Sequence, residues 1–94
     1  MQQNFTNKQH ILHSYKIIGN NVKRLRMSKN ISQLSLSLAI GHKAVGTISM
    51  CELCINGKHF NIEHLIKISK VLDVPICEFF KGIDDIVNDK QNEE

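Results

Sequence analysis

The amino-acid sequence predicts an all-α domain of five helices, and three observations point to it. Apolar residues recur at spacings of three and four along 11–25, which is the pattern of one side of a helix. A second stripe of this kind runs along 65–72. Between the two stripes, Ser32 and Gly41 are residue types that often begin and end helices.

The first stripe is compatible with one long helix or with two helices that meet near Ser14. One continuous helix would have to contain Gly19, which costs roughly 1 kcal/mol relative to alanine.

Two interpretations fit the next stretch, 32–40. Ser32 is a favourable N-cap, and Gly41 can adopt the left-handed conformation that ends a helix. However, four large apolar residues alternate here with serines and an alanine, which is typical of a half-buried strand. The pattern alone therefore favours neither.

A further helix is expected to begin near Ala44 or Val45 and to end at residue 54. Residues three or four apart divide it into two faces. The packing face would consist of Ile48, Cys51, Glu52 and Ile55. The free face would consist of Gly46, Ser49, Met50 and Leu53.

Two more helices complete the predicted fold. Asn61 is a good N-cap for a fourth helix, which Asp73 would end. Pro75 suits the first position of a fifth helix, because its missing N–H group is not needed there. Gly82 would close this last helix.

The composition indicates one small domain with a modest core, because 41% of its 94 residues are hydrophobic. We expect a flexible N-terminus at 1–9, the domain at 10–82 and an acidic tail at 83–94. Residues 82–94 carry a net charge of −4, so the preceding 81 residues carry +7. A basic body suits a polyanion partner such as duplex DNA, although lysines also serve solubility alone.

The sequence favours a cytoplasmic protein with reduced thiols. No stretch approaches the roughly eighteen apolar residues of a membrane span, and the N-terminus lacks the pattern of a signal peptide. Three cysteines are an odd number at spacings that fit no disulfide framework.

Several groups of residues match one family pattern in combination. They are Ile18-Gly19, Val22, Leu25, Arg26, Ser32-Gln33, Leu36-Ser37, Ile40-Gly41, Thr47-Ile48-Ser49, Glu52, Asn56-Gly57-Lys58, 65–70, 72–74 and Phe79-Phe80. With them, 18–80 resembles the Cro and lambda-repressor-like helix-turn-helix family, also called the XRE family. The resemblance covers about two thirds of the chain and favours a helix at 32–40. It makes Ile11 and Tyr15 part of an N-terminal extension, which would cover the core or contact a dimer partner.

The resemblance implies a sequence-specific transcription regulator that binds double-stranded DNA as a homodimer. We expect it to be a repressor. Helix 45–54 would enter the major groove. The base-facing positions of the family match Val45, Gly46, Ser49 and Met50. Their side chains offer little beyond methyl contacts and one hydroxyl, so we expect modest direct base recognition with help from DNA shape. Antitoxins, restriction-modification controllers and phage-type regulators share this fold, and the sequence does not separate them.

Polar residues around helix 45–54 are expected to hold phosphates. This set consists of Gln33, Thr47, Asn56, Lys58 and His59, with the Gly57 amide. Lys43 and Ala44, just before the helix, complete the expected DNA-binding residues. The Asn56-Gly57-Lys58 triplet comes about three residues later than in the family, so we predict roughly one extra helical turn before it.

The resemblance also implies two structural contacts. Arg26 would form an ion pair with Glu52, since a half-buried guanidinium needs a charged partner. The last helix would carry the dimer contact, although at least one phenylalanine could instead fill the core. The expected dimer residues are Ile76, Phe79, Phe80 and Ile83.

An alternative is a zinc-binding interaction module. Cys51, Cys54, His59 and His64 have the spacing C-x2-C-x4-H-x4-H, which could supply four tetrahedral ligands. Against it, Cys51 occupies an apolar helix position, where cysteine behaves as a small hydrophobe. No catalytic set or glycine-rich phosphate loop is recognisable, so we expect neither an enzyme nor a cofactor.

Overall fold

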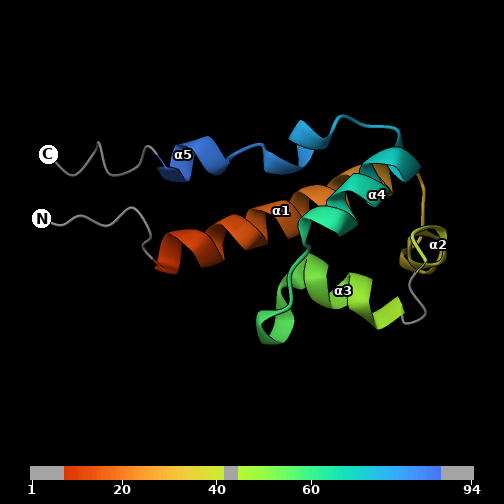
Figure 1. The fold of residues 1–94 in the computed structure, drawn as a ribbon, viewed down its shortest axis with the longest axis horizontal. Coiled ribbons are helices and arrows are strands. Elements are labelled where there is room, and N and C mark those ends of the chain that lie inside the picture. The colour runs from red at the N-terminus through yellow and green to blue at the C-terminus, as the bar shows by residue number, and fades with distance from the viewer. Residues whose placement is uncertain (1–7, 42–44, 88–94) are drawn as a thin grey trace, which may run out of the picture.

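The protein is all-helical over the residues that the computed structural model describes, 8–41 and 45–87. Five α-helices and two short 3-10 helices follow one another along the chain (Figure 1). They are α1 (Lys8–Ser28), α2 (Gln33–Ala39), α3 (Val45–Leu53), η1 (Ile55–Gly57), α4 (Ile62–Leu72), η2 (Ile76–Phe80) and α5 (Ile83–Val87). No strand occurs in these two described ranges, which confirms the predicted all-α fold.

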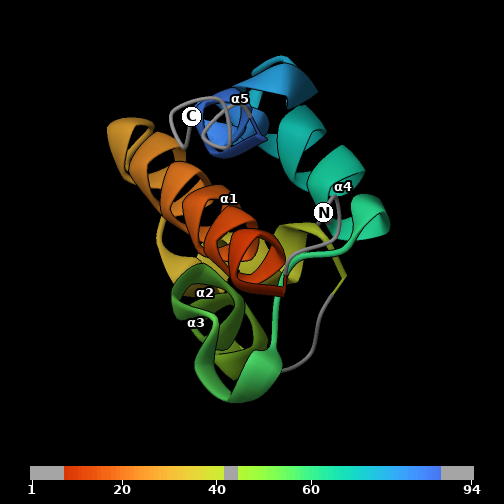
Figure 2. The ribbon, with the colours of Figure 1, turned by 90° about the vertical axis from the view of Figure 1, so that its left-hand side faces the viewer.

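Helix α1 is the longest element, and α3, η2 and α5 pack directly on it. It is one continuous helix, so the alternative of a break near Ser14 was wrong. Helices α2 and α3 lie on one side of α1, while α4, η2 and α5 lie on the other (Figures 1 and 2). None of the helices in the described ranges is long and apolar enough to cross a membrane.

The core fills the space between these two groups of helices. Every element of 18–79 except η1 contributes at least one buried apolar side chain. The most deeply buried apolar residues are Val22, Leu36, Ile48, Leu65, Ile68, Leu72 and Phe79.

The segment with the alternating apolar pattern, 34–40, lies in helix α2 and its C-cap, and the burial of its side chains explains the pattern. Leu36 and Ile40 are four residues apart and both buried, whereas Leu34 and Leu38 are 55% and 65% exposed. A helix places residues four apart on one face. The alternating residues are therefore two such pairs, Leu36 with Ile40 on the buried face and Leu34 with Leu38 on the exposed face. The Ser32 hydroxyl accepts a hydrogen bond from the Ser35 amide at 3.0 Å and caps the helix as predicted.

Helix α4 is also bounded as predicted. The Asn61 side chain accepts a hydrogen bond from the His64 amide at 2.7 Å, and the His64 ring bonds back to the Asn61 amide at 3.1 Å. This reciprocal capping satisfies two backbone donors that the helix leaves open. Asp73, in the left-handed conformation, ends the helix.

The C-terminal segment differs from the prediction. Residues 76–80 form a 3-10 helix, and a separate helix, α5, follows within the expected acidic tail. The buried Asn21 amide donates to the carbonyls of Phe79 at 2.9 Å and Lys81 at 3.0 Å, and so holds η2 against α1. Ile86 of α5 is buried as well.

At the N-terminal end, Lys8 begins α1 within the segment 1–9 that was expected to be flexible. The proposed boundaries of the domain stay a prediction.

Candidate nucleic-acid interface

Helix α3 has one packed side and one open side. Ile48, Cys51 and Glu52 are at most 4% exposed. Four residues of the opposite side reach solvent to differing degrees, namely Gly46, Ser49, Met50 and Leu53. The open side is the one predicted from the spacing, and no other described part of the chain buries it.

The end of α3 differs from the prediction. The helix stops at Leu53, because Cys54 adopts the left-handed conformation with φ 56°. Ile55, expected on the packing face, is 42% exposed for this reason. Roughly one extra helical turn was predicted here, and the structure has the 3-10 turn η1, in which Asn56 and Gly57 have positive φ.

An ion pair holds α3 to the end of α1. The Arg26 Nε donates to one Glu52 carboxylate oxygen at 2.7 Å and its Nη2 donates to the other at 3.1 Å. The remaining guanidinium nitrogen, Nη1, donates to the Ile31 carbonyl at 2.8 Å, in the turn before α2. A two-point pair of this kind fixes orientation as well as distance. It therefore ties three segments together beneath the open side of α3.

Gln33 joins the same network. Its side-chain amide donates to Glu52 at 3.0 Å, which links the first turn of α2 to α3. The expected role of Gln33 was a phosphate contact. In the structure its side chain links the two helices to each other, and the phosphate contact stays a prediction.

Helices α1 and α3 approach very closely at Gly19. A Cβ atom added there would lie 2.5 Å from the Glu52 carbonyl oxygen and 2.7 Å from that of Cys51. Both of these atoms belong to the backbone of α3. Gly19 is therefore needed for this approach, a role that its expected cost in a helix did not suggest.

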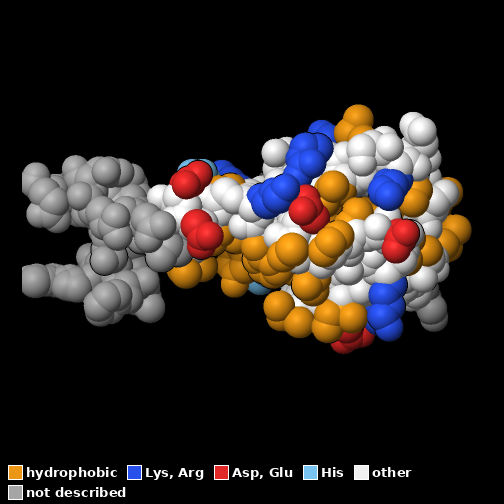
Figure 3. Space-filling view, turned by 90° about the horizontal axis from the view of Figure 1, so that it is seen from above, with side chains coloured by type: hydrophobic (Ala, Val, Ile, Leu, Met, Phe, Trp, Pro, Cys, Tyr) orange, Lys and Arg blue, Asp and Glu red, His pale blue; other side chains and the backbone are white. Residues whose placement is uncertain are grey.

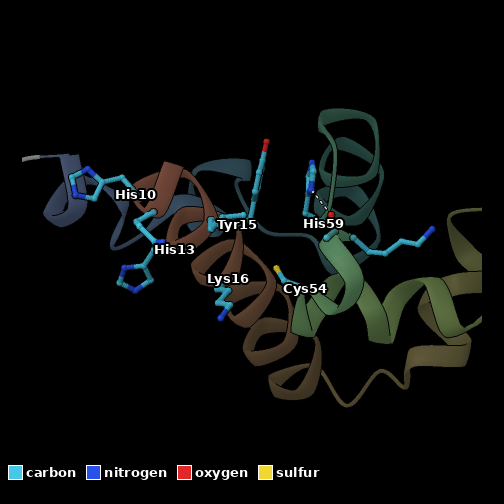
Figure 4. A pocket seen from close by; sticks show the side chains of 10 residues that line it. His10, His13, Tyr15, Lys16, Cys54 and His59 are labelled. Atoms are coloured by element: carbon cyan, nitrogen blue, oxygen red, sulfur yellow. Dashed lines mark hydrogen bonds between the residues drawn. The ribbon is translucent and has the colours of Figure 1, made fainter. Parts of the chain in front are cut away.

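The loop after α3 presents the other expected phosphate contacts. Asn56, Gly57 and Lys58 are exposed. The His59 ring lies 3.1 Å from the Gly57 carbonyl and stacks on the Tyr15 ring of α1, with centroids 3.7 Å apart and planes 13° apart (Figure 4). The loop is therefore held against the N-terminal part of α1.

Three of the expected DNA-binding residues are placed incompletely or not at all. Lys43 and Ala44 lie outside the described residues, and Val45 is described only as the first residue of α3. Thr47 is partly exposed in the first turn of α3.

The expected dimer residues do not share one environment. Phe79 is completely buried, so its assignment to a dimer contact was wrong, and it belongs to the core. Phe80 and Ile83 pack partly against that core, whereas Ile76 is 36% exposed. Apolar side chains gather on the side of the molecule that carries η2 and α5 (Figure 3).

The four residues of the zinc spacing are not brought together. Within the described residues, no three His, Cys, Asp or Glu side chains are placed to hold a metal ion. Cys51 lies in the core, and His64 caps α4. All three cysteines are free thiols.

The thiols should differ in reactivity. Burial raises the pKa of Cys51 above its ordinary value, and Cys54 adds to this while Lys58 opposes it. Burial also raises the pKa of Cys54, against the effect of Lys16.

Because the thiolate is the nucleophile, iodoacetamide at neutral pH should label the exposed Cys77 first and Cys51 last, with rates that differ by more than roughly tenfold. Peptide mass mapping over time measures this order. Equal labelling of Cys77 and Cys51 in the folded protein would contradict it, and labelling in urea provides the control.

Sequence reasoning missed two features that position the interface, the close approach at Gly19 and the stack of Tyr15 on His59. It also missed the role of Asn21, which holds η2 against α1. Asn21 could have been suspected as a polar residue beside the apolar stripe of α1. The stack of Tyr15 on His59 had no signal in the sequence, because it joins residues far apart in the chain.

Comparison with protein families matches a family model described as helix-turn-helix to residues 22–79. The matched segment covers more than half of the chain and contains α2, α3 and α4. It begins within α1, so residues 8–21 of this helix precede it. No curated protein and no solved structure matches the chain.

Proposed function

The chain belongs to the helix-turn-helix family of DNA-binding regulators of the Cro and C1 type, and we propose that it is a sequence-specific transcription regulator that places α3 in the major groove of double-stranded DNA. The observation that carries this proposal is the division of α3 into two sides. One is anchored by the core and by the Arg26 ion pair, and the other is open to a partner.

The open side of α3 is uncharged, so none of its side chains opposes entry into a DNA groove. Gly46 and Ser49 are small, so the helix backbone can approach base edges closely, and Met50 can contact a thymine methyl group. The single acidic residue of α3, Glu52, is buried and paired with Arg26. No carboxylate of α3 therefore faces the phosphates.

Contacts to the backbone would come from the segments at either end of α3. Lys58 and Asn56 are exposed on the loop that follows the helix, and Thr47 lies in its first turn. Such contacts position a protein on DNA without reading its sequence. Affinity should consequently fall with rising salt.

We further propose that the regulator acts as a homodimer and as a repressor, by covering a two-fold symmetric site. Ile76, Phe80 and Ile83 are the remaining candidates for the dimer contact. In this arrangement the half-site centres lie about 34–36 Å apart, or one turn of DNA.

Selection of bound sites from random duplex DNA tests this proposal directly. The expected result is a palindrome whose half-site centres are about 10–10.5 base pairs apart. Recovery of unrelated sequences with no two-fold symmetry would count against a sequence-specific dimer. Absence of saturable binding to any duplex would refute the DNA-binding proposal itself.

Lys58→Ala should weaken binding to the selected site by roughly tenfold, because one charge-assisted phosphate contact is lost per protomer. The slope of log affinity against log salt should fall by about 0.9 for each contact removed. Fluorescence anisotropy at several salt concentrations measures both quantities. Lys67→Ala is the matched control, since Lys67 is an exposed lysine already paired with Glu63 at 2.8 Å on α4. Equal effects of the two substitutions would rule out a specific role for Lys58.

A further inference from the structure

A groove of about 640 Å³ lies between the N-terminal part of α1 and the loop that follows α3 (Figure 4). Helix α1 supplies His10, His13, Tyr15 and Lys16 to its wall, and the loop supplies Lys58 and His59. In Figure 4, the rings of Tyr15 and His59 stand side by side where the two walls meet.

The lining of this groove has the chemistry of an anion site. Two lysines and three histidines line it, and none of its lining residues is acidic. The ion pairs formed within the described residues include neither Lys16 nor Lys58. Both ammonium groups are therefore available to neutralise a ligand.

The groove is held in shape by its two walls. The stack of Tyr15 on His59 joins them, and the left-handed residues Cys54, Asn56 and Gly57 set the path of the loop. A ligand would therefore lose little affinity to the ordering of these walls.

The location of the groove connects it to the proposed DNA-binding surface. Lys58 and His59 belong both to the groove and to the expected phosphate contacts that follow α3. The wall formed by α1 lies outside the family match, which begins at Val22. This wall therefore precedes the matched helix-turn-helix segment.

We propose that the groove binds the sugar-phosphate backbone of DNA that flanks the half-site, so that the extension of α1 lengthens the footprint of the protein. This inference rests on the proposed DNA-binding function. Residues 8–16 of α1 span about 12 Å, which corresponds to roughly three to four base pairs along the duplex. The contact should be independent of sequence, because phosphates are the same at every step.

The test compares two duplexes that carry the selected site. The short duplex ends at the outer edges of the two half-sites, and the long duplex adds about five base pairs of arbitrary sequence on each side. We expect wild-type protein to bind the long duplex at least roughly tenfold more tightly. His13→Gln with Lys16→Gln should remove this advantage, lower the salt slope on the long duplex by about 0.9 per protomer for the lost Lys16 charge, and leave binding to the short duplex unchanged. Both residues are exposed, so the fold should tolerate the change, and Lys67→Gln is the matched control.

Each other outcome has a distinct meaning. Equal affinity of the wild type for both duplexes, or an advantage that survives the double substitution, would overturn the flanking contact and leave the proposed function intact. Absence of saturable binding to either duplex would overturn the proposed function together with this inference. Titration with inorganic phosphate and with adenosine monophosphate, followed by NMR of the histidine rings, tests whether the groove instead binds a small phosphate-containing molecule. Saturable nucleotide binding below about 1 mM, without any effect of flanking DNA, would overturn the assignment in favour of a small-molecule pocket.

Discussion

Replacing Glu52 by alanine is expected to lower the free energy of unfolding by about 3–5 kcal/mol, the range measured when one partner of a buried ion pair is removed. The carboxylate is 1% exposed and the Arg26 side chain 9% exposed, so water cannot replace the lost partner easily. Glu52→Ala would leave two guanidinium donors and the Gln33 amide without their acceptor. A domain of this size has roughly 5–15 kcal/mol of stability in total, so the variant should be close to unfolding.

Urea unfolding followed by circular dichroism measures this effect. Glu52→Gln should cost less than Glu52→Ala, because the amide keeps one acceptor oxygen for Arg26. The exposed pair formed by Glu63 and Lys67 provides the control, and Glu63→Ala should cost less than about 1 kcal/mol. If Glu52→Ala and Glu63→Ala had equal effects, the buried pair would not be a stabilising contact.

The same substitution should affect DNA binding through the position of α3. The ion pair and Gln33 fix this helix relative to α1 and α2. At a temperature where Glu52→Ala is still folded, we expect weaker binding to the selected site and little change in the salt slope, because no phosphate contact is lost. This combination distinguishes Glu52 from Lys58, for which both quantities should fall.

The features that could be predicted from the sequence are mainly those governed by neighbouring residues. The apolar stripes of α1 and α4 arise from residues three and four apart, and the N-caps at Ser32 and Asn61 act within one turn. The two sides of α3 followed from the same spacing. The choice of helix over strand at 33–39 needed the family resemblance, because an alternating pattern fits both.

The features that escaped prediction depend on contacts between distant segments. Residues 76–80 form a 3-10 helix held by Asn21, which is 58 positions away from Phe79. The end of α3 depends on left-handed backbone at Cys54, a residue type that rarely adopts it. The stack of Tyr15 on His59, which brings the walls of the groove together, is likewise tertiary.

Replacing Gly19 by alanine is expected to lower the free energy of unfolding by about 2 kcal/mol. In an ordinary helix interior this change would instead stabilise the protein by up to about 1 kcal/mol. Here the new methyl group would lie 2.5 Å and 2.7 Å from two backbone carbonyl oxygens of α3. Neither oxygen belongs to a flexible side chain, so the two helices would have to separate. A fall in melting temperature of roughly 10 °C should accompany this change.

Gly46→Ala is the matched control, because both glycines lie within helices and differ mainly in their surroundings. A Cβ atom at Gly46 would meet nothing within 4 Å, so alanine there should leave stability unchanged or raise it slightly. Opposite signs for the two substitutions would trace the effect of Gly19→Ala to the close approach of α1 and α3. Because this approach sets how far α3 stands from α1, Gly19→Ala should also weaken binding to the selected site in protein that remains folded. A Gly19→Ala variant as stable as the wild type would show instead that the helices can separate at little cost, and would remove Gly19 from the residues that position α3.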